Sequence, residues 1–81
     1  MVTRVFISDP VYPHFLLHLG EALEDWVKVS HKYFLIHYLP DDPVQPDLRE
    51  SDILISDNRS SVEFIQRIRR EAEEWKRGEV R

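Results

Sequence analysis

The chain has 81 residues, no cysteine and a formal net charge of −4 at pH 7. This length predicts a single domain over residues 1–81, and the missing cysteines exclude disulfide bonds and thiolate metal sites. The acidic balance disfavours binding to nucleic acids, because phosphate recognition normally requires a basic excess. No apolar run approaches the ~18 residues of a membrane span, so we expect a cytoplasmic protein that does not enter membranes.

The first half of the chain predicts a strand, a helix and a second strand. Residues 2–8 contain consecutive apolar side chains, as expected of a strand that is covered on both faces. Residues 13–28 place apolar side chains at helical spacing, with charged side chains between them. Residues 33–39 form a second aromatic and β-branched run, which Pro40 ends.

The second half predicts a stiff loop, a short strand and a long helix. Three prolines lie within residues 40–47 and argue against regular structure there. Residues 52–56 indicate the third strand. Ser60 and Glu63 match a capping box, so the last helix should begin near Ser60, and Gly78 is a plausible stop signal. The charged residues of this helix predict a solvated face.

These elements predict an α/β fold: a small three-stranded, Rossmann-like sheet with two main helices, in the order β-α-β-β-α. An antiparallel hairpin between the second and third strands would instead give an α+β sandwich. Three strands and two helices leave one edge or face of the sheet poorly covered. Because such edges pair readily and dimers are the commonest soluble oligomers, we expect a homodimer.

The first and third predicted strands both end in the tripeptide Ile-Ser-Asp. Ser8 and Asp9 close one run, and Ser56 and Asp57 close the other. If the strands are parallel, these side chains lie on one rim of the sheet, at the carboxyl ends where open α/β domains bind ligands. The pattern indicates where a site would lie, without indicating a reaction or a cofactor.

The same rim predicts a metal site. Asp9, Asp41 and Asp57 would come near one another if all three strands were parallel, and carboxylates at strand ends can hold Mg²⁺. The alternative is that aspartate is common wherever a strand stops, since its side chain bonds the nearby backbone. His37, within the second strand, is expected to pack beside Tyr38, with a general-base role near the rim as the alternative.

The junction between the third strand and the last helix predicts an anion site. A helix start offers free N–H groups to anions, and Ser56, Ser60 and Ser61 supply hydroxyl groups there. Arg59 could add a bidentate phosphate contact. The alternative is a capped helix with a solvated Arg59.

Residues 51–57 and the pair Ser60-Ser61 resemble the strand-loop-helix of glycerophosphotransferases of the CDP-glycerol type. In that family a similar aspartate-then-double-serine loop contacts the donor nucleotide, which implies a nucleotide-binding role for Asp57 and the two serines. This sequence has one additional residue before the serines.

A second resemblance is to the TIR and nucleoside deoxyribosyltransferase group. It is carried by residues 5–8, by Phe15, Leu19, Leu23 and Glu24, and by residues 52–56. In that group a glutamate at the start of a later helix acts on an N-glycosidic bond, and Glu63 is its nearest match here. The resemblance implies a catalytic role for Glu63. In a nucleotide-processing enzyme, Asp57 and Asp9 would join Glu63 in acid–base or ribose-binding roles.

Three functions follow from these features, in decreasing order of preference. The first is a small standalone binding or interaction module with an anion or nucleotide site at the strand ends, which catalyses nothing by itself. The second is an enzyme that processes nucleotides at an N-glycosidic or phosphate bond. The third is a Mg²⁺-dependent domain that handles phosphate groups.

Overall fold

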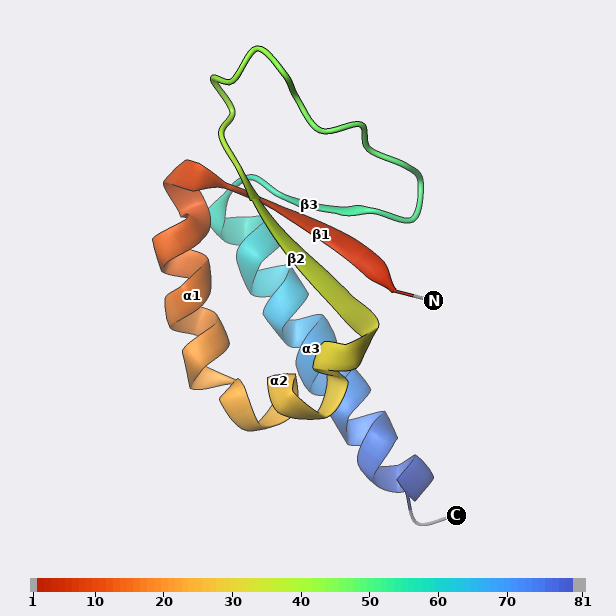
Figure 1. Ribbon diagram of the computed structural model, residues 1–81. Helices are drawn as coiled ribbons and strands as arrows, with labels where there is room; N and C mark the ends of the chain where they lie inside the picture. The colour runs from red at the N-terminus through yellow and green to blue at the C-terminus, as the bar shows by residue number, and fades with distance from the viewer. Residues whose placement is uncertain (1, 80–81) are drawn as a thin grey trace.

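The computed structural model describes residues 2–79, which form a mixed α/β fold (Figure 1). The strands are β1 (Thr3–Ser8), β2 (Tyr33–Tyr38) and β3 (Ile53–Ile55); the helices are α1 (Tyr12–Glu21), α2 (Leu23–Val29) and α3 (Asn58–Glu79), with 3-10 turns at Asp9–Val11 and Ser30–Lys32. Within this part of the chain, no helix combines the length and apolar character that crossing a membrane requires.

The three strands are parallel and lie in the order β2-β1-β3. β2 and β3 each pair with β1, so the alternative of an antiparallel hairpin between them is wrong. The predicted α/β class and parallel strands are confirmed. Because all strands run the same way, their carboxyl ends lie on one rim, as the sequence predicts.

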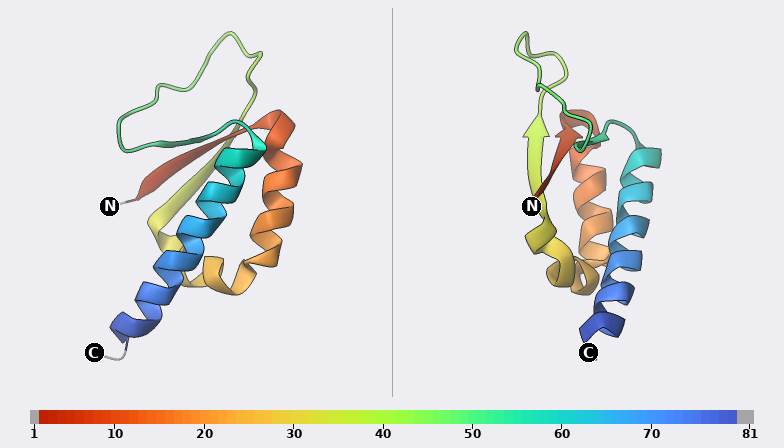
Figure 2. Two further views of the ribbon diagram at one scale, coloured as in Figure 1. Left: turned by 180° about the vertical axis from the view of Figure 1, so that it is seen from behind. Right: turned by 90° about the vertical axis from the view of Figure 1, so that its right-hand side faces the viewer.

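The helices cover one face of the sheet (Figure 2). Alternate β1 side chains, Val5 and Ile7, are fully buried against Phe15 of α1 and Ile68 of α3, within one apolar core. This alternation follows from the period of two along a strand. The core therefore lies between the sheet and the helices, and the opposite sheet face has no helix among residues 2–79.

That opposite face is apolar and partly exposed. Phe6 lies at its centre, with Ile36 of β2 and Leu54 of β3 in register on either side. Phe6 is only 4 % exposed, because its neighbours and the Arg4 guanidinium, 5.1 Å from its ring centroid, cover it. Phe34 and Leu54 are 59 % and 42 % exposed. A parallel sheet is normally covered on both faces, so this open face is unusual.

An ion pair on the same side fastens β3 to β1. Arg4 Nε donates to Asp52 Oδ1 at 3.1 Å, and Arg4 also donates to the Asp47 carbonyl at 3.1 Å. The Asp52 side chain is 3 % exposed, and its other oxygen accepts from the Arg49 backbone N–H at 2.8 Å. These contacts order the end of the long loop and set where β3 begins.

Both predicted helices differ in extent from the observed ones. The helix predicted over residues 13–28 is divided at Ala22, whose backbone has φ −109° and ψ 29°. The apolar spacing continues through this break and conceals it, while Gly20, a weak helix former, lies two residues earlier. The last helix begins at Asn58 and runs through Gly78.

Candidate functional site

The start of α3, where the sequence predicts an anion site, is closed by the chain's own side chains. Asp57 Oδ1 accepts a hydrogen bond from the Ser60 backbone N–H at 2.7 Å. Ser60 Oγ accepts from the backbone N–H groups of Ser56 and Asp57 at 3.1 and 3.2 Å. Backbone and side-chain hydrogen bonds from Ser60 hold the pKa of Asp57 below its ordinary value. A carboxylate thus occupies the place where a phosphate would meet this helix.

These contacts form a capping box of Asp57 and Ser60, so the predicted box of Ser60 and Glu63 is wrong by one turn. The helix starts two residues earlier than predicted, which puts Ser60 in its first turn. Glu63 Oε1 instead pairs with Arg59 Nε at 3.1 Å on an exposed surface. Glu63 and Arg59, predicted as catalytic and anion-binding residues, neutralise one another.

Two of the predicted ligand-binding serines are inaccessible. Ser61 is 0 % exposed, and its Oγ has no hydrogen-bond partner within residues 2–79. Ser8 is also buried. Ser56 is exposed, but its backbone N–H is already used by Ser60. Of the predicted anion-binding hydroxyl groups, only those of Ser56 and Ser60 reach the surface.

The rim between β1 and β2 holds a different arrangement. His37 Nε2 lies 2.7 Å from Asp9 Oδ1, and the ring of Tyr12 stacks on the His37 ring, with centroids 4.1 Å apart and planes 6° from parallel. β1 places Asp9 just beyond its end, β2 presents His37, and the first turn of α1 supplies Tyr12. The rim thus contains a hydrogen-bonded carboxylate–imidazole pair that is fixed from one side by an aromatic ring.

A hollow of about 330 Å³ lies beside Asp9, walled by Leu39 and by Asp41, Asp42 and neighbouring prolines. Within residues 2–79, however, no group of three or more histidine, aspartate or glutamate side chains could hold a metal ion. Asp9, Asp41 and Asp57 do not form such a group there, and a Mg²⁺ site at the rim stays a prediction. Asp57 is engaged at the helix cap, and Asp9 pairs with His37.

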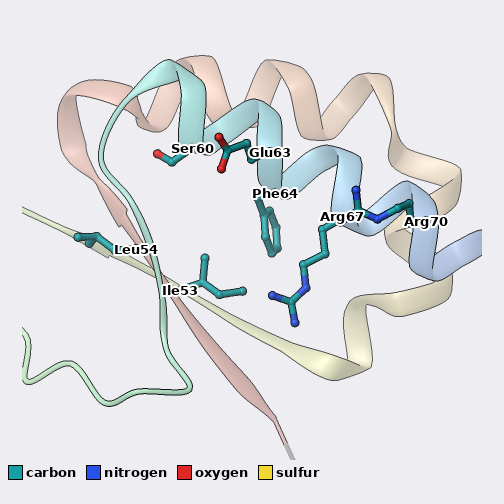
Figure 3. A pocket seen from close by; sticks show the side chains of 7 residues that line it. All are labelled: Ile53, Leu54, Ser60, Glu63, Phe64, Arg67 and Arg70. Atoms are coloured by element: carbon teal, nitrogen blue, oxygen red, sulfur yellow. The ribbon is translucent and has the colours of Figure 1, made fainter.

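A second hollow, of about 270 Å³, lies between the outer edge of β3 and α3 (Figure 3). We call it the β3 groove; its lining residues are Ile53, Leu54, Ser60, Glu63, Phe64, Arg67 and Arg70. Figure 3 shows Phe64 and Arg67 extending from α3 toward Ile53 on β3. The groove therefore has an apolar floor and a basic wall.

Arg67 is held in place by a polar cluster at the far end of the groove. Its guanidinium lies 5.8 Å from the Tyr33 ring centroid, and its Nε lies 3.8 Å from Glu71 Oε2. Lys32 approaches the same carboxylate at 3.7 Å, and the Tyr33 hydroxyl donates to its other oxygen. Burial, and then the hydrogen bond to Glu71, raise the pKa of Tyr33 to about 12.

The sequence did not single out the arginines of the β3 groove. Arg67 and Arg70 are three residues apart, so helical geometry puts them on one flank, but the charged pattern of this helix equally suits a solvated face. Only the packing of α3 beside the edge strand shows which flank borders a hollow.

No protein-family model matches this chain, and no curated protein or solved structure matches it either. The resemblances to glycerophosphotransferases and to the TIR and deoxyribosyltransferase group therefore remain predictions.

Proposed function

We propose that the protein is a small interaction module that catalyses no reaction by itself and acts as a homodimer joined along β2. The observation that carries this proposal is the free edge of β2. Among residues 2–79, this strand pairs with β1 alone. An unpaired strand edge presents a row of N–H and C=O groups that can accept another strand.

The composition of β2 suits pairing with a second copy. Residues 33–38 contain no lysine, arginine, aspartate or glutamate, so two copies of the strand bring no like charges together. Lys32 directly precedes the strand, whereas Asp41 and Asp42 follow it. Antiparallel pairing sets the basic end of each strand beside the acidic end of the other, which favours this orientation electrostatically.

The pairing would be symmetric and would form a continuous six-stranded sheet. With the two-fold axis perpendicular to the sheet, a register centred on Ile36 sets Phe34 opposite Tyr38 of the second copy. The helices of both copies then cover the same face, and the two open faces adjoin one another. Isologous contacts of this kind are the commonest way in which identical chains associate.

The test compares two positions that share one environment. Ile36 and Leu54 flank Phe6 in the same register on the open face, but Ile36 lies on the β2 edge and Leu54 on the β3 edge. We expect Ile36→Lys to give a monomer by light scattering, because two lysines would meet near the axis, and Leu54→Lys to remain a dimer. A monomeric wild type, or an equal effect of both substitutions, would refute the proposal.

A second candidate function is ligand binding at the β1–β2 rim, with Asp9 and His37 as an acid–base pair. Their 2.7 Å contact and the stacked Tyr12 ring favour it.

The nucleotide ligand, the Mg²⁺-dependent alternative, the Rossmann-like classification and the cytoplasmic location remain predictions. A thermal-shift panel of nucleotides, sugar nucleotides and divalent metals tests the rim: any specific shift should disappear in His37→Gln, and the absence of any shift would contradict this candidate.

A further inference from the structure

We infer that the β3 groove binds an extended segment of another protein that carries an acidic side chain. This inference goes beyond the homodimer, because β2 and β3 are the two opposite edges of the sheet. A dimer joined along β2 leaves both β3 grooves free. The bound segment would lie along β3 as an added strand, with an apolar and an acidic side chain of one face in the groove.

The backbone of β3 supplies the first contact. Within residues 2–79, β3 pairs with β1 alone, and its residues Ile53 and Leu54 line the groove. Alternate peptide groups of an edge strand have no partner and can pair with an incoming chain, which provides affinity without regard to sequence. Because β3 has three residues, this contact is short, and side chains must provide much of the remaining affinity.

The apolar floor supplies the second contact. Ile53 is half-buried and Phe64 is buried beneath the groove, while the Leu54 side chain is 42 % exposed at its border. Added strands place alternate side chains toward the flanking helix. An apolar side chain of the segment would therefore cover Ile53 where it faces α3.

The arginines supply the third contact and determine the charge of the partner. Arg70 is exposed, and no ion pair involves it within residues 2–79, whereas Arg67 is oriented toward the groove by Tyr33 and Glu71. Among the lining residues, Glu63 pairs with Arg59 and Arg67 pairs with Glu71, whose carboxylate also lies near Lys32, so Arg70 is the charge of the lining that has no such partner within residues 2–79. The uncompensated charge of the lining is therefore positive, and a carboxylate is the side chain that complements it.

The same features argue for a protein segment over a small anion. The nearby helix start, which would otherwise attract a phosphate, is already occupied by the Asp57 carboxylate. A phosphate group cannot pair with a strand edge and cover an apolar floor, whereas an extended peptide can do both.

The test uses a short synthetic peptide that repeats Val-Thr-Glu-Thr, so that valine and glutamate project from the same face of the strand, labelled for fluorescence anisotropy. Two control peptides carry lysine in place of glutamate, or N-methyl groups that prevent strand pairing. We expect the acidic peptide to bind at least about tenfold more tightly than either control, as a charge-assisted hydrogen bond implies. Amide chemical shifts should change at Ile53–Ile55. No binding of the acidic peptide, or equal binding of all three, would overturn the inference.

Two adjacent arginines provide matched variants. Arg70 lines the β3 groove, whereas Arg69 lies on the other flank of α3, beside His18 and Ile65. Both are exposed helix positions, so replacement by glutamine should leave the circular dichroism spectrum unchanged. We expect Arg70→Gln to weaken binding about tenfold and Arg69→Gln to leave it unchanged. An equal loss in both variants would indicate unspecific attraction and overturn the inference.

The same samples separate this inference from the homodimer. Light scattering should show that Arg70→Gln keeps the oligomeric state of the wild type, and Ile36→Lys should still bind the acidic peptide. Peptide binding by a protein that proves monomeric would support the groove and refute only the proposed function. Loss of peptide binding in Ile36→Lys would overturn the independence of the two edges.

Discussion

Ser60 and Ser61 are adjacent, yet replacing each by alanine should change stability in opposite directions. Ser60 Oγ accepts two backbone N–H groups at the start of α3. Ser61 Oγ is buried and has no hydrogen-bond partner within residues 2–79. The comparison keeps the substitution, the helix and the local sequence constant. It therefore tests whether the capping box is assigned to the correct residues.

For Ser61→Ala the expected change is a gain. A buried hydroxyl without a partner costs roughly 1–3 kcal/mol by mutational data, and alanine is a better helix former than serine by about 0.5 kcal/mol. The small void left by the oxygen offsets part of this sum, so we expect a gain of about 1–2 kcal/mol. For a domain of this size, that raises the unfolding midpoint by roughly 4–16 °C.

For Ser60→Ala the expected change is a loss. The substitution leaves the backbone N–H groups of Ser56 and Asp57 without their protein acceptor and removes one half of the capping box. Loss of a helix cap costs about 1 kcal/mol, which lowers the midpoint by roughly 4–8 °C.

Urea unfolding followed by circular dichroism measures both variants against the wild type, with thermal unfolding as the second readout. Destabilisation by Ser61→Ala would refute the reasoning, because it would mean that the hydroxyl has a partner. A neutral Ser60→Ala would show that the cap depends on Asp57 alone.

Two further predictions concern pH. Hydrogen bonds from Arg4, and then from the Arg49 backbone, lower the pKa of Asp52. The contribution of Asp52 to folding stability is therefore complete above the ordinary pKa of 3.8 and is lost as the pH falls below that value. When the pH is lowered below about 4, the urea midpoint should decrease steeply in the wild type and less steeply in Asp52→Asn; parallel acid profiles would contradict this. The pKa of Tyr33 is raised from 10.0 to about 12, by burial and then by Glu71, so its contribution is complete below pH 10 and is lost as pH rises toward 12. Tyr33→Phe should therefore lower stability at neutral pH and flatten the alkaline loss, and an unchanged alkaline slope would contradict the raised pKa of Tyr33.

Local pattern was enough to predict the strands, the helical regions and the mixed α/β class. The consecutive apolar residues of β1 identify a strand, and the helical spacing of Ile65, Ile68 and Ala72 identifies the buried side of α3, because a helix repeats every 3.6 residues. The expectation that Asp9 and Asp57 lie at one rim needs only one further condition, that the strands they follow run parallel.

Other local details could not be read in this way. Two reciprocal caps overlap in the sequence: Ser60 with Glu63 matches the capping-box pattern, whereas Asp57 with Ser60 has a serine where that pattern has glutamate or glutamine. Which one forms depends on where β3 stops and α3 packs, since that packing buries Ser61 and leaves Glu63 at the surface. The break at Ala22 is likewise set by packing, because the apolar spacing runs through it without interruption.

The sequence by itself thus determined the elements and which of their faces are apolar, since these depend on side chains only a few residues apart. The tertiary structure decided which side chains meet across the sheet. Asp9 contacts His37 across 28 positions, and Arg4 contacts Asp52 across 48. It also decided that β1 is central, which leaves β2 and β3 as the edges of the sheet that residues 2–79 form and places Arg67 and Arg70 beside one of them. Contacts between distant positions follow from strand order and helix packing, for which a short-range pattern in one sequence contains no signal.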